Sequence, residues 1–238
     1  SYNIFDEDVK KFIEPLSENI SESIGSMGDD TPLAILSDFD RKFYDFFKQQ
    51  FAQVTNPPID SLRENSVMSL YKYLGSEDNL LNNTPTKNSA IRISTPILSL
   101  KEINELKSFN FWFPHEEIDC LYKIGSKLDS KIESIRKNCE KSILKGNKII
   151  FLTDQNLKLD HTPIPMLLVI SAVHHHLIEK KLRSRVSLIA ATGDVIEDHH
   201  FAALISLGAS AIYPHFAYEI IFKKENKVKY FRTKFKHI

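Results

Sequence analysis

The chain has 238 residues with 31 basic and 31 acidic side chains, so its formal net charge is zero when the histidines are neutral. This balance gives no overall field that would attract nucleic acid or an anionic membrane, and the 42% hydrophobic content is typical of a globular protein. No apolar run approaches the ~20 residues of a membrane-spanning helix, and the first residues are acidic where a signal peptide would be basic. Two cysteines are too few for a disulfide framework and fit a reducing compartment.

The first 90 residues are expected to form a helical N-terminal extension. Acidic residues begin a short amphipathic segment at residues 6–13, which predicts a helix that ends before Pro15. Residues 25–32 (GSMGDDTP) are typical of an exposed turn, and phosphate binding is the weaker interpretation because a P-loop lysine is missing. A second helix is predicted from Asp40, with a buried aromatic face at helical spacing. That face comprises Phe43, Phe46, Phe47 and Phe51.

Residues 51–60 (FAQVTNPPID) are the most constrained stretch of the chain. Pro57 and Pro58 fix two φ angles and remove two backbone donors, and Pro57 also drives Asn56 out of the helical region. Thr55 and Asn56 must therefore lie in extended or turn backbone. This elbow either joins two helices rigidly or lines a surface that faces a partner, and a further helix is expected after it, from residue 62 to Gly75.

From Ile91 onward, short apolar strands alternate with helical segments, which predicts parallel βα units with right-handed crossovers. The expected strands are residues 91–93, 95–99, 109–113, 148–152, 185–191 and 209–213. The expected helices are residues 116–145, 163–182 and 199–207. A closed eight-unit barrel takes ~250 residues, more than this part of the chain provides.

We therefore predict an α/β fold, an incomplete (half or rudimentary) TIM-barrel-like parallel βα layer with the helical extension before it. The expected divisions are a helical part at 1–90, a βα-repeat part at 91–221 and a basic tail at 222–238. We interpret the tail as a linker and keep a nucleic-acid arm as the alternative, because the rest of the chain has no basic face.

Histidines and strand-end aspartates are the candidate chemical groups. His174, His175 and His176 are consecutive on a predicted helix, so their side chains diverge by ~100° and cannot converge on one metal ion. Asp154 follows a predicted strand, where barrel enzymes place functional groups. Two alternatives remain open: a free-standing α/β enzyme that uses Asp154, Asp194 and the histidines, or a zinc-binding module that also recruits the pair at 199–200.

Several long blocks occur in one order and together resemble the central domain of the glutamate synthase large subunit. These blocks are GSMGDDTPLAILS at 25–37, YDFFKQQFAQVTNPPID at 44–60, LRENSVMSL at 62–70, NLL at 79–81, SAVHHHLIEKKLRSRVSLI at 171–189 and HHFAALISLGASAIYPHFAYE at 199–219. The resemblance extends over residues 6–219, and only residues 100–147 are nondescript. It implies a rudimentary barrel that joins a glutamine amidotransferase domain to an FMN-binding barrel of the same polypeptide.

In that enzyme, ammonia released from glutamine reacts with 2-oxoglutarate, and reduced FMN and an iron–sulfur cluster supply electrons. The resemblance implies no catalytic, cofactor-binding or metal-binding residue in this domain, which helps to line the ammonia tunnel. By the matching blocks, Thr55 and Asn56 are expected to line the tunnel. The residues expected at a domain interface are Gly28, Asp29, Asp30, Thr31 and Pro32.

The chain lacks the amidotransferase cysteine domain and the flavin barrel, and two cysteines cannot ligate the family's cluster. We therefore expect an excised domain or a fragment that is catalytically silent alone. The implied partner of the complete enzyme is ferredoxin or an NADPH-oxidising subunit, with no nucleic acid and no membrane, in the cytoplasm or the plastid stroma.

Overall fold

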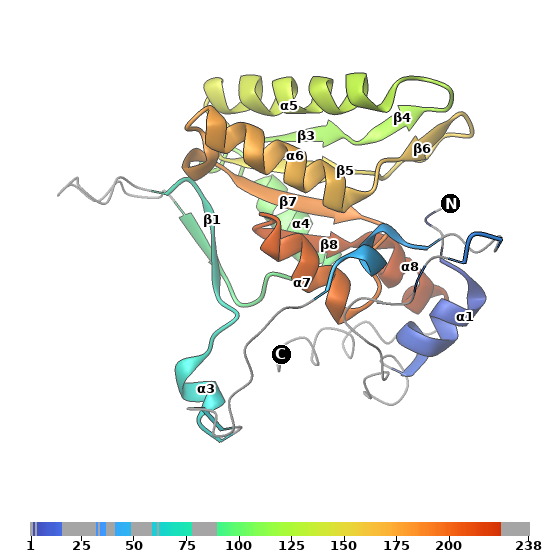
Figure 1. Ribbon diagram of the computed structural model, residues 1–238. Coiled ribbons are helices and arrows are strands. Elements are labelled where there is room, and N and C mark those ends of the chain that lie inside the picture. Colours follow the sequence, from blue (N-terminus) through green and yellow to red (C-terminus); the bar gives the residue numbers. More distant parts are fainter. Residues whose placement is uncertain are drawn as a thin grey trace.

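A computed structural model describes residues 2, 4–15, 32, 34–36, 41–48, 59–60, 62–77 and 90–224 (Figure 1). The predicted tunnel residues Thr55 and Asn56, the prolines of the elbow and the interface residues at 28–31 lie outside this part of the chain. The basic tail lies outside it from residue 225 onward.

A parallel four-stranded sheet forms the centre of the molecule, with the strand order β3-β5-β7-β8. Its strands are β3 His115–Asp119, β5 Ile149–Thr153, β7 Ser187–Thr192 and β8 Ala211–Pro214. The helices that connect them are α5 Leu128–Leu144, α6 Met166–Glu179 and α7 Asp198–Ser206. In the register, Ile150 lies between Glu116 of β3 and Leu188 of β7.

Each strand of this sheet pairs with the next one along the chain, which is the winding of a barrel and not of a doubly wound sheet. Right-handed crossovers in this order place successive helices on one face, and α5 packs on α6 and α6 on α7 (Figure 1). All residues of β5 and β7 are buried, as expected for central strands covered on both faces. Among the described residues the sheet does not close, so the predicted α/β, incomplete barrel-like layer is confirmed.

The edge of β8 carries one further parallel contact, from a segment that precedes the whole sheet in sequence. Ile97 forms an isolated parallel bridge with Ile212, and the Leu98 amide donates to the Ile212 carbonyl at 2.8 Å. The strand predicted at 95–99 is therefore only this bridge. Next comes α4 Leu100–Ser108, which Ser99 begins with a capping box closed by Glu102.

Two short strands, the 3-10 turn η3 Arg183–Arg185 and one further helix complete the described βα part. Strands β4 Leu121–Lys123 and β6 His161–Pro163 form an antiparallel pair beyond the ends of β3 and β5. Helix α8 His215–Lys224 follows β8 directly, and no helix was predicted there. None of the described helices has the length and apolar character needed to cross a membrane.

Within the N-terminal part, the helix predicted at 6–13 is confirmed as one α-helical turn, α1 Asp6–Asp8, that continues as a π-helix, η1 Val9–Ile13. Glu14 and Pro15 are also helical, so the predicted end before Pro15 is wrong. The aromatic helix predicted from Asp40 is wrong in the part that the structure describes. A single 3-10 turn, η2 Phe43–Phe46, replaces it. With three residues per turn, Phe43 and Phe46 share an outer side, and Tyr44 is the buried aromatic.

The helix predicted at 62–75 is also wrong. Only α3 Glu64–Val67 is helical in this stretch. Strand β1 Lys72–Gly75 pairs antiparallel with β2 Ala90–Ile93, and β2 corresponds to the strand predicted at 91–93. Figure 1 shows this ribbon and α3 extending away from the sheet. The apolar residues around Tyr71 and Leu74 fit the spacing of a helix as well as that of a strand, and pairing with β2 determines that a strand forms.

Two predictions around α5 are also corrected. Residues 109–113 (FNFWF) are turns after α4 and not a strand, and Phe111 and Trp112 are exposed. The helix predicted at 116–145 begins only at Leu128, because the residues before it form β3 and β4. Strand β3 lies at the sheet edge and carries solvated acids, so it lacks the apolar run that marks a buried strand.

Candidate functional site at the carboxyl edge of the sheet

The carboxyl ends of β5, β7 and β8 bring several polar side chains together. Asp154 follows β5, Thr192 ends β7, and His215 begins α8 immediately after β8. Parallel strands place their carboxyl ends at one edge of a sheet, where α/β proteins bind ligands. Tyr2 and Tyr44 reach the same edge from the N-terminal part.

The carboxylate of Asp154 is fully buried, and each of its hydrogen bonds is with a donor. Its Oδ1 accepts from His215 Nε2 at 2.8 Å and from the Gly193 amide at 3.1 Å, and the Tyr2 hydroxyl lies 3.2 Å away. Its Oδ2 accepts from Thr192 Oγ1 at 2.5 Å. Hydrogen bonds from this many donors hold the buried Asp154 side chain in position, and its oxygens have no exposed surface for a ligand.

Asp194 shares Thr192 with Asp154. Its Oδ1 lies 2.8 Å from Thr192 Oγ1 and 3.0 Å from the Tyr44 hydroxyl, while Oδ2 accepts from the Met166 amide at 3.1 Å. Burial, followed by the charge of Asp154, raises the pKa of Asp194.

A proton count follows from these distances. The Thr192 hydroxyl has one proton but lies within hydrogen-bonding distance of both carboxyl groups. It can donate to only one of them, so the second contact needs a proton on a carboxyl oxygen. The raised pKa of Asp194 favours the protonated form of this carboxyl group.

Tyr44 ties the 3-10 turn η2 to this edge. Its hydroxyl contacts Asp194, its carbonyl accepts from His199 Nε2 at 2.9 Å, and its ring lies 4.2 Å from the ring of His200. Burial, with the neighbouring Asp194, raises the pKa of the Tyr44 phenol. The phenol therefore stays protonated and serves as a hydrogen-bond donor.

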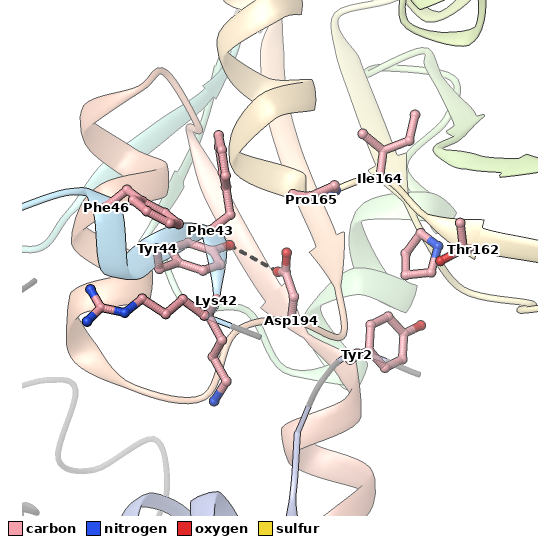
Figure 2. Close-up of a pocket in the computed structure, with 11 residues that line it drawn as sticks. Tyr2, Lys42, Phe43, Tyr44, Phe46, Thr162, Ile164, Pro165 and Asp194 are labelled. Carbon is pink, nitrogen blue, oxygen red and sulfur yellow. Dashed lines mark hydrogen bonds between the residues drawn. The ribbon is translucent and has the colours of Figure 1, made fainter. Parts of the chain in front are cut away.

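A cavity of about 350 Å³ opens beside Asp194, with the carboxyl group between Tyr44 and Tyr2 (Figure 2). Its walls come from three segments: the N-terminal part, the β6–α6 connection and the β7–α7 turn. The lining residues are Tyr2, Arg41, Lys42, Phe43, Tyr44, Phe46, Thr162, Pro163, Ile164, Pro165 and Asp194. The Lys42 ammonium at the rim pairs with Asp8 at 3.0 Å. The cavity therefore offers aromatic and proline walls with hydroxyl and carboxyl groups at its base.

The consecutive histidines of α6 have three separate partners. His174 Nδ1 accepts from Arg183 Nε at 2.9 Å, His175 Nδ1 lies 2.8 Å from the Ser171 carbonyl, and His176 Nε2 lies 2.9 Å from Glu140. The rings of His174 and His175 meet edge-on at 5.5 Å, but the three imidazoles bond to different groups. Among the described residues, no group of three or more histidine, cysteine or acidic side chains is arranged to hold a metal ion.

The pair at 199–200 likewise joins helix α7 to its surroundings. The N-cap of α7 is Glu197, and His200 Nε2 lies 3.0 Å from its carboxylate. His200 Nδ1 accepts from the Ile196 amide at 3.2 Å.

Only part of this site could be found in the sequence. Asp154 and Asp194 were named as strand-end groups, and the structure links them through Thr192. Thr192 and His215 also follow from their positions at strand ends, but Tyr2 is placed by tertiary structure alone. Of the predicted interface residues, Pro32 is described and is exposed.

Comparison with known proteins gives a family. The family profile described as "Glutamate synthase central domain" matches residues 1–237. The chain is 41% identical over 213 residues to the NADPH glutamate synthase large chain of Bacillus subtilis, 42% over 224 residues to the ferredoxin-dependent enzyme of Pyropia yezoensis, and 37% over 231 residues to the NADH enzyme of Schizosaccharomyces pombe. These alignments cover 89%, 92% and 94% of this chain.

The same alignments cover only 14%, 14% and 11% of the three relatives, so the chain spans a small part of their length. Among solved structures, a flavocytochrome b2 variant with bound pyruvate shares 16% identity with a TM-score of 0.35, over 58% of this chain and 33% of its own. The family match covers nearly every residue of the chain. The chain therefore belongs to the glutamate synthase central domain family.

Proposed function

We propose that this chain is the connecting domain of a glutamate synthase, the enzyme that makes glutamate from glutamine and 2-oxoglutarate. In this role it joins the glutamine amidotransferase domain to the FMN domain, helps to line the ammonia path between them, and performs no chemistry itself. Family membership supports the enzyme, and the surface of the N-terminal part supports the connecting role.

The observation that carries the proposal is an apolar arm, residues 62–73, which contains α3 and the start of strand β1. Leu62 is 90% exposed, and four more large side chains of this arm are more than half exposed. These are Val67, Met68, Tyr71 and Tyr73. Figure 1 shows the arm projecting from the sheet, and monomeric domains rarely expose such a cluster without a partner. We infer that another domain of the same polypeptide covers it.

The proposed tunnel residues Thr55 and Asn56 lie just before this arm in sequence. Neutral ammonia needs small polar groups that are held rigidly, and the prolines at 57 and 58 supply rigidity without backbone donors. The proposed interface residues at 28–31, with the exposed Pro32, would contribute a second contact with the neighbouring domains.

Both cofactors of the complete enzyme belong to other domains in this proposal. An iron–sulfur cluster needs four thiolates in the usual case, whereas this chain has only Cys120 and Cys139. Both thiols are buried, and burial raises the pKa of the Cys139 thiol to about 12. The residues of this chain therefore do not fit a cluster. FMN is assigned to the barrel domain, and electrons to ferredoxin or to an NADPH-oxidising subunit.

Two parts of the proposal extend beyond the site. The working compartment is the cytoplasm or the plastid stroma, and neither nucleic acid nor a membrane is a partner. The division into an N-terminal part at 1–90, a βα part at 91–221 and a tail at 222–238 remains part of this proposal.

A free-standing enzyme that uses Asp154 is less well supported. A catalytic carboxylate must reach its substrate, but the Asp154 side chain is about 1% exposed and its oxygens already accept from protein donors. Asp194 does face the cavity, yet its contacts are with Tyr44, Thr192 and a helix amide. This arrangement is better suited to holding the edge of the sheet together.

Substitutions in the complete enzyme test the ammonia path. We expect Thr55→Val and Asn56→Leu to leave glutamine hydrolysis and ammonia-dependent glutamate synthesis intact while the ratio of glutamate formed to glutamine hydrolysed falls. An unchanged ratio would return the elbow to a purely structural role.

The arm is tested by Leu62→Lys and Met68→Lys. Because both side chains are exposed, we expect the thermal midpoint of the 238-residue chain to stay unchanged, while the complete enzyme loses coupling between its sites. Leu159→Lys is the control, since Leu159 is at least as exposed as either arm residue but lies outside the arm. If Leu159→Lys and the arm variants affect coupling equally, the arm is not an interface.

A further inference from the structure

The hydroxyl group of Tyr2 is held at the carboxyl edge of the sheet by Asp154. It lies 3.0 Å from the Asp154 carbonyl and 3.2 Å from Oδ1 of the same residue, so its one proton is shared between two acceptors. Burial, followed by the charge of Asp154, raises the pKa of the phenol. The phenol is therefore a stable donor, and Asp154 is presented to it by Gly193, Thr192 and His215.

The ring of Tyr2 is enclosed as specifically as its hydroxyl. It meets the ring of His215 edge-on at 5.7 Å and lies 5.2 Å from the ring of Phe216. Beneath it, a Cβ added to Gly193 would lie 2.4 Å from the ring carbon Cζ. No other residue type fits at position 193 while the ring is in place, because real Cβ atoms do not approach a side chain so closely.

We propose that Asp154, Gly193, His215 and Phe216 form a phenol socket, a binding site for a para-substituted phenol whose natural occupant is the Tyr2 side chain. The polar acceptor lies at the base, two aromatic rings form the walls, and a glycine gives the ring its flat floor. These are the features by which proteins usually bind an aromatic ring with one polar end.

The socket has a consequence for the domain if the proposed function is correct. The segment that carries Tyr2 would then lead toward the amidotransferase domain, and the socket would fasten that junction to the carboxyl edge of the sheet. Tyr2 is also a wall of the cavity beside Asp194 (Figure 2).

The experiment uses the 238-residue chain, so its outcome is independent of the linking role. Tyr2→Ala empties the socket, and we expect its thermal midpoint to fall and then to rise again when p-cresol is added. At a concentration about tenfold above the dissociation constant, the expected rise is about 3–6 °C. Wild type should show no such rise, because Tyr2 occupies the socket. Tyr73→Ala is the matched control, since Tyr73 is an exposed tyrosine of β1 outside the socket.

Gly193→Ala makes the test specific for the socket. Alone, it should lower the thermal midpoint by displacing Tyr2; added to Tyr2→Ala, it should cost much less and should abolish the p-cresol effect. An equal p-cresol rise in the double variant, or no rise in Tyr2→Ala, would overturn the proposal.

If Tyr2→Ala does not fold, a 3-fluorotyrosine at position 2 of the otherwise unchanged chain gives the answer. A ¹⁹F resonance that is shifted from its denatured position and returns there in Gly193→Ala supports the socket. A resonance at the denatured position in the unchanged chain refutes it.

Discussion

Replacing Thr192 by valine tests the hydroxyl group that contacts both Asp154 and Asp194 at the carboxyl edge of the sheet. Thr192 is fully buried, and valine has nearly the same shape, so the change removes only a hydroxyl between two carboxyl groups. The lost bond to the buried Asp154 carboxylate is charge-assisted and is worth about 1.5–3 kcal/mol. The carboxyl group and the backbone amide of Asp194 also lose their contacts with this hydroxyl, which adds about 1 kcal/mol.

The expected loss of unfolding free energy is therefore about 3 kcal/mol. For a domain of this size, each kcal/mol shifts the thermal midpoint by about 2–4 °C, so the predicted decrease is about 6–12 °C. Circular dichroism melts measure it, and urea unfolding with an unchanged slope would show that the loss is one of stability and not of cooperativity.

Thr192→Ser is the matched control, because it keeps the hydroxyl and loses only a methyl group, at a cost of about 1 kcal/mol. The valine variant must therefore be clearly less stable than the serine variant. A valine variant that is as stable as serine, or more stable, would refute the bridging hydroxyl.

Three further predictions follow from other contacts. Gly208→Ala should destabilise the chain more than Gly146→Ala. Both glycines have positive φ (118° and 98°), so both variants carry backbone strain of about 1–3 kcal/mol, but only at Gly208 would a Cβ meet a side chain, His174 Nδ1 at 2.3 Å. Equal losses of stability in thermal melts would contradict this clash. Asp194→Asn should become more stable relative to wild type as the pH rises. The raised folded-state pKa of Asp194 gives wild type a contribution to stability that is present at low pH and is lost as the pH rises through that pKa. A difference in thermal midpoint that stays constant from about pH 4 to 8 would exclude this titration. Cys120 and Cys139 are buried and burial raises the pKa of both thiols, so a disulfide reagent at neutral pH should modify them only as fast as the chain unfolds, and rapid labelling of the native chain would contradict their placement.

The central strands could be predicted because strands that are buried on both faces have a continuous apolar composition. Segments such as 148–152 (KIIFL) and 185–191 (RVSLIAA) are short, apolar and β-branched, and they became β5 and β7 with shifts of one or two residues. The edge strand β3 was missed because solvated Glu116 and Glu117 interrupt any apolar pattern. The aromatic helix from Asp40 was wrong because spacing alone does not distinguish a 3-10 turn from an α-helix when tertiary contacts of Tyr44 decide.

The candidate site, like the strands, could be predicted only in part. Asp154 was found because a parallel sheet presents residues just after its strands at one edge. Tyr2 lies 152 positions away from it in the chain, and no local pattern encodes a contact of that range. The prediction that consecutive histidines on a helix diverge needed only helical geometry, and the three separate partners of His174, His175 and His176 agree with it.

The bridge between Ile97 and Ile212 determines how this half-barrel ends. An open sheet exposes two edges, and each is a template onto which another strand could add. Here the β8 edge is occupied at Ile212 by the chain just before α4, while the β3 edge carries acids that discourage pairing. Further strands therefore cannot extend the sheet at Ile212 without first displacing the segment around Ile97. The incomplete barrel is therefore terminated at Ile212 by its own chain.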